Sequence, residues 1–141
     1  MATKADYSAE EWQILQWATM NTMAYLSLAD PGFWDSFKEA TGAAKFLAAE
    51  KDSGTNQLIR DLAGDVRTKR DKEATSNPTT LADEVAERVA EAVALVAEKD
   101  AADVDAFRAF ILGLAEATAV AVDGVGETET GAIARITVAL G

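Results

Sequence analysis

The sequence predicts an all-α protein, folded as a single compact bundle of about six helices over residues 1–141. Alanine, the residue with the highest helix propensity, occurs 30 times, whereas proline occurs only as Pro31 and Pro78. Apolar residues recur every three or four positions along most of the chain, which is the spacing of amphipathic helices. With 49% apolar residues, the chain has enough hydrophobic side chains to build a core.

The N-terminal half is predicted to contain three helices. Ser8 and Glu11 have the spacing of a capping box, in which each side chain accepts a hydrogen bond from the other residue's backbone amide. The first helix therefore begins after Ser8. Pro31 disfavours helical backbone at the residue before it and ends the helix. The second and third predicted helices span about 33–51 and about 55–70, each with apolar residues on one face.

A surface loop at residues 71–80 is predicted to join the two halves, because this stretch is polar and contains an Asn-Pro pair. Three more helices follow, at about 80–98, 103–122 and 128–140, each with an apolar stripe. Asp103 is expected to cap the second of these three helices.

Both halves contain a long apolar helix followed by an aspartate, a glycine-containing turn and a shorter helix. The aspartate is Asp30 in the first half and Asp123 in the second. Two interpretations stay open. One is a structural duplication, with two helical hairpins packed around a pseudo-twofold axis. The other is a chance match between alanine-rich helices.

The stretch VAVDGVGETETGAIARI, which contains the second of these turns, resembles the helix–turn–helix signature of the TerB-like domain known from tellurite-resistance TerB. The matching positions are Asp123, Gly124 and Glu129, and Asp30 matches in the first half. Glu127 departs from the pattern, because a small capping residue is usual there. The resemblance implies a compact helical bundle with an internal repeat, a bacterial-type stress or metal-related role, and no defined reaction.

Composition narrows the chemistry further. The chain has no cysteine and no histidine, so it lacks a thiolate nucleophile, the usual neutral-pH proton carrier and the common zinc ligands. We therefore expect a non-enzymatic protein without a cofactor. A metal, if bound, is held by oxygens, which suits Ca²⁺ or Mg²⁺. The net charge of −11 argues against nucleic acid as a partner. With no secretory signal and no membrane-length apolar run, a cytoplasmic protein is expected.

The candidate metal ligands are the acids of the two Asp turns. Asp123, Glu127 and Glu129 lie within seven residues, and the repeat adds Asp30. The spacing is not that of an EF-hand, but it allows a looser Ca²⁺ or Mg²⁺ site. The alternative is a turn between two helices, with acids favoured at the positive N-terminus of the second.

Glu116 is the other candidate ligand, because it lies in a long uncharged stretch and on the same helix face as Asp123. Partial burial would require a metal or an arginine as its partner, and Arg108 and Arg135 are the candidates. Otherwise Glu116 lies on the solvated side of its helix.

Two surfaces are candidates for contact with a protein partner. Aromatic residues gather in the first 40 positions; most are expected in the core, but Phe33 and Trp34 are candidates for an interaction site, with Trp34 exposed. Asp83, Glu87 and Glu91 form an acidic stripe on the helix at about 80–98, either a solvated face or a docking surface for a basic partner.

These observations lead to two functional hypotheses. The first is a non-enzymatic, stress-related TerB-like protein that acts through protein interaction or weak divalent-metal binding at its acidic turns. The alternative is a plain interaction or scaffold domain that uses the aromatic-rich N-terminal hairpin, with a homodimer as one form of this hypothesis. Neither hypothesis includes membrane insertion.

Overall fold

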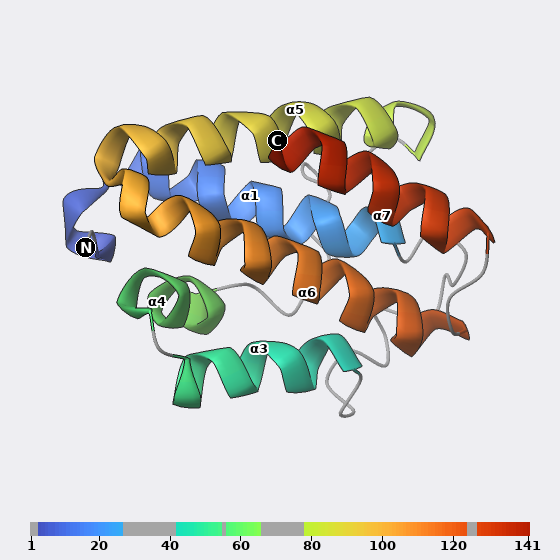
Figure 1. The fold of residues 1–141 in the computed structure, drawn as a ribbon, viewed down its shortest axis with the longest axis horizontal. Coiled ribbons are helices and arrows are strands. Elements are labelled where there is room, and N and C mark those ends of the chain that lie inside the picture. The colour runs from blue at the N-terminus through green and yellow to red at the C-terminus, as the bar shows by residue number, and fades with distance from the viewer. Residues whose placement is uncertain (1–2, 27–41, 55, 66–77, 124–126) are drawn as a thin grey trace.

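The structure is a computed structural model that describes residues 3–26, 42–54, 56–65, 78–123 and 127–141. Within these ranges the chain forms six α-helices, two short 3-10 helices and no strand, which confirms the all-α prediction (Figure 1). The α-helices are α1 (Ala9–Leu26), α3 (Gly42–Ser53), α4 (Gln57–Asp65), α5 (Pro78–Lys99), α6 (Val104–Asp123) and α7 (Glu127–Leu140). The 3-10 helices are η1 (Lys4–Asp6) and η2 (Ala101–Asp103).

The start of α1 is fixed by the capping box that the sequence predicts. The Ser8 amide donates to Glu11 Oε1 at 2.8 Å, and the Glu11 amide donates to Ser8 Oγ at 3.1 Å. Two of the amides left without partners at the helix start are thereby satisfied.

The predicted loop at 71–80 is wrong at its C-terminal end, because α5 already begins at Pro78. Proline has no amide hydrogen and a φ angle suited to a helix, so it is tolerated at the first helical position. The rest of the predicted loop, 71–77, lies outside the described residues.

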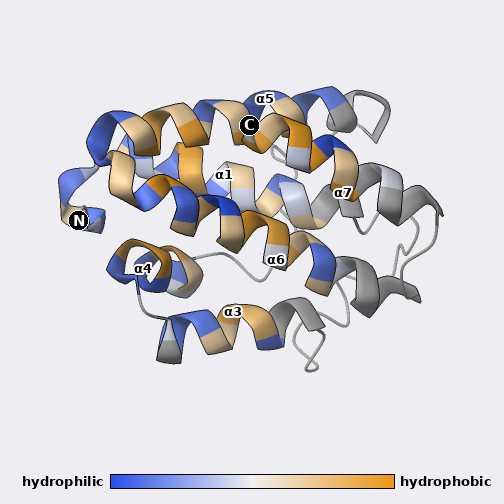
Figure 2. Cartoon of the chain, in the orientation of Figure 1, coloured by the Kyte–Doolittle hydropathy of each residue, from blue (hydrophilic) through white to orange (hydrophobic). Residues whose placement is uncertain are grey.

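The core is built around α1 and α6. Helix α1 packs against α5 and α6, while α3 and α4 pack against each other and contact α6 on another side (Figure 1). Helix α7 lies against α5 and α6. Along α5 and α6, hydrophobic and hydrophilic bands alternate, as expected for amphipathic helices (Figure 2). The largest fully buried side chains are Leu15, Met20, Met23, Leu58, Leu62, Phe107, Ile111, Leu114 and Ile136.

Several buried positions on α1 and α6 are threonines, and each satisfies its hydroxyl within its own helix. Thr19 Oγ1 donates to the Leu15 carbonyl and Thr22 Oγ1 to the Ala18 carbonyl, both at 2.8 Å. Since the hydroxyl is bonded locally, the threonine methyl can pack in the core without leaving a buried donor unpaired.

Two helical glycines provide a matched test of the packing between α3 and α6. We expect Gly131→Ala to raise the free energy of unfolding by about 1 kcal/mol, because alanine favours the helix and the added Cβ meets no atom within 4 Å. We expect Gly113→Ala to give no such gain, because its Cβ would lie 2.8 Å from Phe46 Cζ. Urea unfolding measures both changes. Equal stabilisation by the two variants would contradict the close contact of Phe46 with α6.

Glu11 makes the stability pH-dependent. Hydrogen bonds from the Ser8 amide and then from Lys99, whose Nζ lies 3.0 Å from Oε1, hold the pKa of Glu11 below its ordinary value of 4.5. A lowered folded-state pKa stabilises the protein above pH 4.5, and this contribution is lost as the pH falls through the lowered pKa. We therefore expect the stability difference between the native protein and Glu11→Gln to shrink below pH 4.5.

Urea unfolding followed across the acidic range checks this expectation. Glu10→Gln, a change at the exposed neighbouring position, is the matched control. A difference between the native protein and Glu11→Gln that stays constant with pH would exclude the proposed role of Glu11.

Candidate functional site

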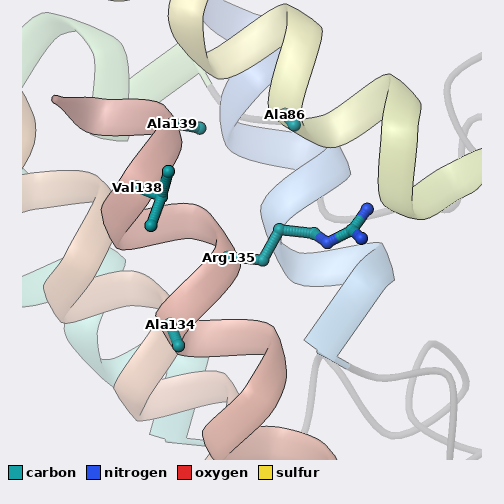
Figure 3. A pocket seen from close by; sticks show the side chains of 5 residues that line it. All are labelled: Ala86, Ala134, Arg135, Val138 and Ala139. Atoms are coloured by element: carbon teal, nitrogen blue, oxygen red, sulfur yellow. The ribbon is translucent and has the colours of Figure 1, made fainter.

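An open groove with a volume of about 430 Å³ lies between α5 and α7. Figure 3 shows the residues that line it, Ala86 from α5 and Ala134, Arg135, Val138 and Ala139 from α7. Val138 is 80% exposed, and no other large hydrophobic side chain in the described part of the chain is exposed. A single exposed valine is ordinary, but one placed beside an apolar groove marks a surface suited to contact.

The groove follows from the small residues on the facing sides of the two helices. Ala86 comes directly after the buried Val85, and Ala139 comes directly before the buried Leu140. The valine and the leucine reach the core, whereas the methyl groups of the alanines are too short to fill the space between the helices at the surface. The groove is therefore apolar and shallow.

One ion pair spans the groove. Arg135 Nη1 lies 3.2 Å from Asp83 Oδ1, so the arginine reaches from α7 to α5 at the solvent-exposed rim. Glu87 and Glu91 continue the exposed acidic line along α5. The predicted acidic stripe is thus confirmed as an exposed face, and its first member stands beside the groove. Because Arg135 is paired, the surface next to the groove remains acidic.

At the predicted metal motif, the structure describes the end of one helix and the start of the next. Helix α6 ends at Asp123 and α7 begins at Glu127, with Glu129 inside the first turn of α7. The side chains of these three residues, and Asp30 as a whole, lie outside the described part of the structure. No group of three metal-binding side chains occurs among the residues described. Binding of Ca²⁺ or Mg²⁺ by this motif stays a prediction.

Glu116 is exposed on α6, which agrees with the alternative in which it lies on the solvated side of its helix and needs no partner. The two arginines considered as its partners are engaged elsewhere. Arg108 Nε donates to the Leu140 carbonyl at 2.9 Å, and Arg135 pairs with Asp83. Phe33 and Trp34, the predicted interaction residues, lie outside the described ranges.

Sequence reasoning missed Val138. The apolar stripe of α7 consists of Ile133, Ile136 and Leu140, which are buried or half-buried. Val138 comes two positions after Ile136, about 200° around the helix, and so points away from the core. Val138 is thus a large apolar residue on the helix face opposite the apolar stripe. This is the sequence signal that could have indicated an apolar surface beside α7.

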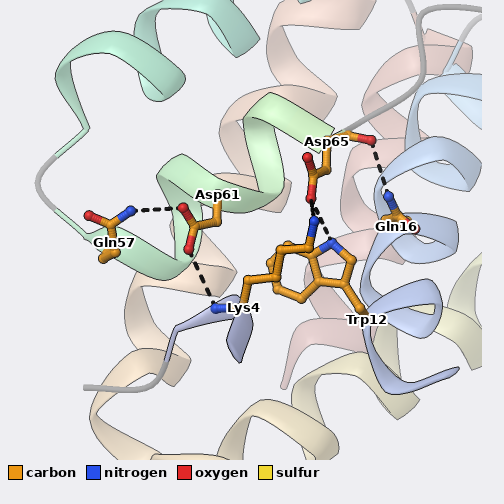
Figure 4. A network of polar contacts seen from close by, with 6 residues as sticks. All are labelled: Lys4, Trp12, Gln16, Gln57, Asp61 and Asp65. Atoms are coloured by element: carbon orange, nitrogen blue, oxygen red, sulfur yellow. Dashed lines mark hydrogen bonds and ion pairs between the residues drawn. The ribbon is translucent and has the colours of Figure 1, made fainter. Parts of the chain in front are cut away.

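The densest polar cluster joins η1 and α1 to α4 (Figure 4). Trp12 Nε1 donates to Asp65 Oδ2 at 3.0 Å, and Lys4 Nζ forms an ion pair with the same oxygen. Gln16 Nε2 donates to the Asp65 carbonyl at 3.1 Å, and Asp61 accepts from Gln57 Nε2 at 2.8 Å. Because these polar groups pair with one another, the cluster holds elements together and presents no obvious reactive group.

A hydrogen bond between Asp103 and Asn56 connects η2, which lies between α5 and α6, to the start of α4. The side chain of Asp103 is buried, and its Oδ1 accepts from Asn56 Nδ2 at 3.1 Å. The Asn56 Oδ1 accepts from the Ile59 amide at 3.2 Å and so caps the start of α4. The N-cap of η2 is Asp100, whose Oδ1 accepts a hydrogen bond from the Ala102 amide at 3.0 Å.

Tyr7 is buried beside this end of the bundle and is unsuited to acid–base work near neutral pH. Burial, followed by the negative charges of Asp103 and Glu11, raises the pKa of Tyr7 to about 12. Its ring meets the Trp12 ring edge to face, with centroids 5.7 Å apart. The phenol therefore stays protonated and contributes packing.

The comparisons with known proteins add no relative. No protein-family model, no curated protein and no solved structure matches the chain. Among the helices described, none has the length and apolar character needed to cross a membrane.

Proposed function

We propose that this protein is a non-enzymatic, cytoplasmic interaction protein that docks a basic amphipathic helix of a partner protein in the α5–α7 groove. The observation that supports this proposal most directly is the 80% exposure of Val138 beside an apolar groove on an otherwise acidic surface. A helix laid in a groove uses apolar side chains at helical spacing as anchors.

Burial of Val138 supplies the affinity in this proposal. Fully burying a valine side chain contributes about 1.5 kcal/mol or more. The neighbouring alanines allow the partner's backbone to approach closely. The partner's basic side chains then lie toward Glu87 and Glu91, whose exposed carboxylates have room for a counter-ion.

The charge of the chain favours a basic partner over a second copy of this protein. Each copy has a net charge of −11 and the same acidic stripe, so a symmetric contact through the groove would bring like charges together. The homodimer alternative relies on Phe33 and Trp34, which lie outside the described residues.

A synthetic helical peptide of leucine and lysine, labelled for fluorescence anisotropy, tests the docking proposal. We expect saturable binding that weakens with salt, and weaker binding of a leucine–glutamate peptide. Val138→Ser should weaken binding by about tenfold, which corresponds to about 1.4 kcal/mol. Ala48→Ser, an exposed change on α3, should leave binding unchanged. Thermal unfolding should show both variants as stable as the native protein.

Two outcomes would overturn the docking proposal. One is equal binding of the lysine and glutamate peptides, or of the native protein and Val138→Ser. The other is self-association, measured by sedimentation equilibrium, that Val138→Ser abolishes, because the groove would then belong to a second copy.

We also propose weak Ca²⁺ or Mg²⁺ binding at the α6–α7 turn, in line with the TerB-like resemblance and the stress-related role it implies. The supporting observation is that Asp123 ends α6 and Glu127 begins α7 only four positions later. We expect calorimetric titration with Ca²⁺ or Mg²⁺ to show a binding heat. Glu129→Gln should reduce this heat, whereas the control variant Glu98→Gln, on α5, should leave it unchanged. Titrations without heat would rule out this site.

A further inference from the structure

A second recess lies on the other side of α6 from the α5–α7 groove. This cavity, with a volume of about 210 Å³, is enclosed by α3, the start of α4 and α6. Its walls include Phe46 and Glu50 from α3, Asn56 and Ile59 from the α4 end, and Phe110 from α6. Apolar walls with a few polar groups are typical of small-molecule sites, and this volume is below the roughly 300–1,000 Å³ of drug-sized pockets.

Two aromatic rings form one wall of the cavity. The centroids of Phe46 and Phe110 lie 5.9 Å apart, with 27° between the ring planes. Gly113 lets the Phe46 ring rest against α6, since a Cβ there would be 2.8 Å from Cζ. Aromatic faces carry partial negative charge and attract cations, more strongly where water is excluded.

Glu50 is the one ionisable side chain among those that line the cavity. It is half-buried, and it forms no ion pair with any residue that the structure describes. The stem of Arg60 lies near the Glu50 carboxylate, because a Cβ at Gly54 would be 3.0 Å from Glu50 Oε2 and 3.2 Å from Arg60 Cγ. Arg60 Nε donates instead to the Lys51 carbonyl, at 3.3 Å. A half-buried carboxylate that forms no ion pair favours a cationic ligand.

The buried carboxylate of Asp103, which is hydrogen-bonded to the lining residue Asn56, adds to the preference for a cationic ligand. Asn56 is held in one orientation, because its Nδ2 donates to Asp103 Oδ1 and its Oδ1 accepts from the Ile59 amide. Asp103 is 1% exposed, so its charge is screened little by solvent. An anionic ligand in this cavity would be repelled by the carboxylates of Glu50 and Asp103.

We propose that this cavity binds a small organic cation, an alkyl- or arylalkylammonium ion. The ammonium group lies beside the Glu50 carboxylate, and the apolar part of the ligand packs against Phe46 and Phe110. This site is independent of the α5–α7 groove, because the two recesses share no lining residue.

Benzylammonium is the probe, and benzyl alcohol and benzoate are its neutral and anionic analogues. In ¹H–¹⁵N NMR titrations of the full chain, we expect saturable shifts with benzylammonium that centre on the amides of α3, the α4 start and α6. Benzyl alcohol should bind at least fivefold more weakly, and benzoate should give no saturable shifts.

Glu50→Gln should weaken benzylammonium binding at least fivefold, whereas Glu98→Gln on α5 should leave it unchanged. Both variants remove one negative charge, and Glu98 is exposed on a helix that does not line the cavity. The comparison therefore separates local recognition from the overall charge. Phe46→Leu, which keeps an apolar side chain but removes the ring face, should also weaken binding severalfold.

Any of three results would overturn the inference. These are an absence of saturable shifts with benzylammonium, equal affinities for benzylammonium and benzyl alcohol, and equal effects of Glu50→Gln and Glu98→Gln. If Phe46→Leu loses its native NMR spectrum, the comparison of Glu50→Gln with Glu98→Gln decides alone. Glu50 is half-buried at the surface, so its replacement by glutamine is expected to leave the fold intact.

Discussion

Burial of α6 on more than one side is the constraint on which the rest of the bundle depends. Phe110 and Ile111 are both buried, as are Leu114 and Ala115. Consecutive residues project about 100° apart around a helix, so one neighbouring helix cannot cover both members of such a pair. Helix α6 must therefore be covered on more than one side, and its contacts with α1, α3, α5 and α7 meet this requirement.

The two surface recesses follow from this arrangement. Because the large side chains of the outer helices are directed to the α1–α6 core, alanines remain where α5 and α7 meet at the surface. On the other side, Phe46 reaches across to Phe110, and the space beside the two rings stays open. An alanine-rich sequence thus favours both close helix packing and shallow apolar recesses.

Most of the helical framework could be predicted from the sequence, because its signals are local. The Ser8–Glu11 capping box and the apolar stripe of α5, which includes the buried Val85, Val89 and Val96, depend only on residues within a few turns. The start of α5 could not be fixed in this way, since a proline after asparagine suits both a loop and the first position of a helix. The contact between Asn56 and Asp103 joins residues 47 positions apart and has no local signal.

The candidate sites were harder to predict for the same reason. The exposure of Val138 depends on which helix covers which face of α7. The lack of an ion pair at Glu50 depends on the direction of Arg60, whose Nε donates to the Lys51 carbonyl. Asp30, Phe33 and Trp34 lie outside the described ranges. The role of Asp30 as a metal ligand and the self-association hypothesis that relies on Phe33 and Trp34 therefore both stay predictions. For Glu116, the periodicity allowed two faces, and tertiary packing placed it on the solvated one.

Negative charge has a different weight in the two recesses. The groove is open, so Asp83 and Glu87 act through water and salt, where an exposed ion pair contributes about 1 kcal/mol or less. Affinity there must come from apolar burial at Val138, and the charges set which partner is accepted. In the smaller cavity, Glu50 is half-buried, and Asp103, which accepts a hydrogen bond from the lining residue Asn56, is fully buried, so the effective dielectric constant is lower. A single charge on a small ligand can therefore decide binding in the cavity, whereas the groove requires a whole helix.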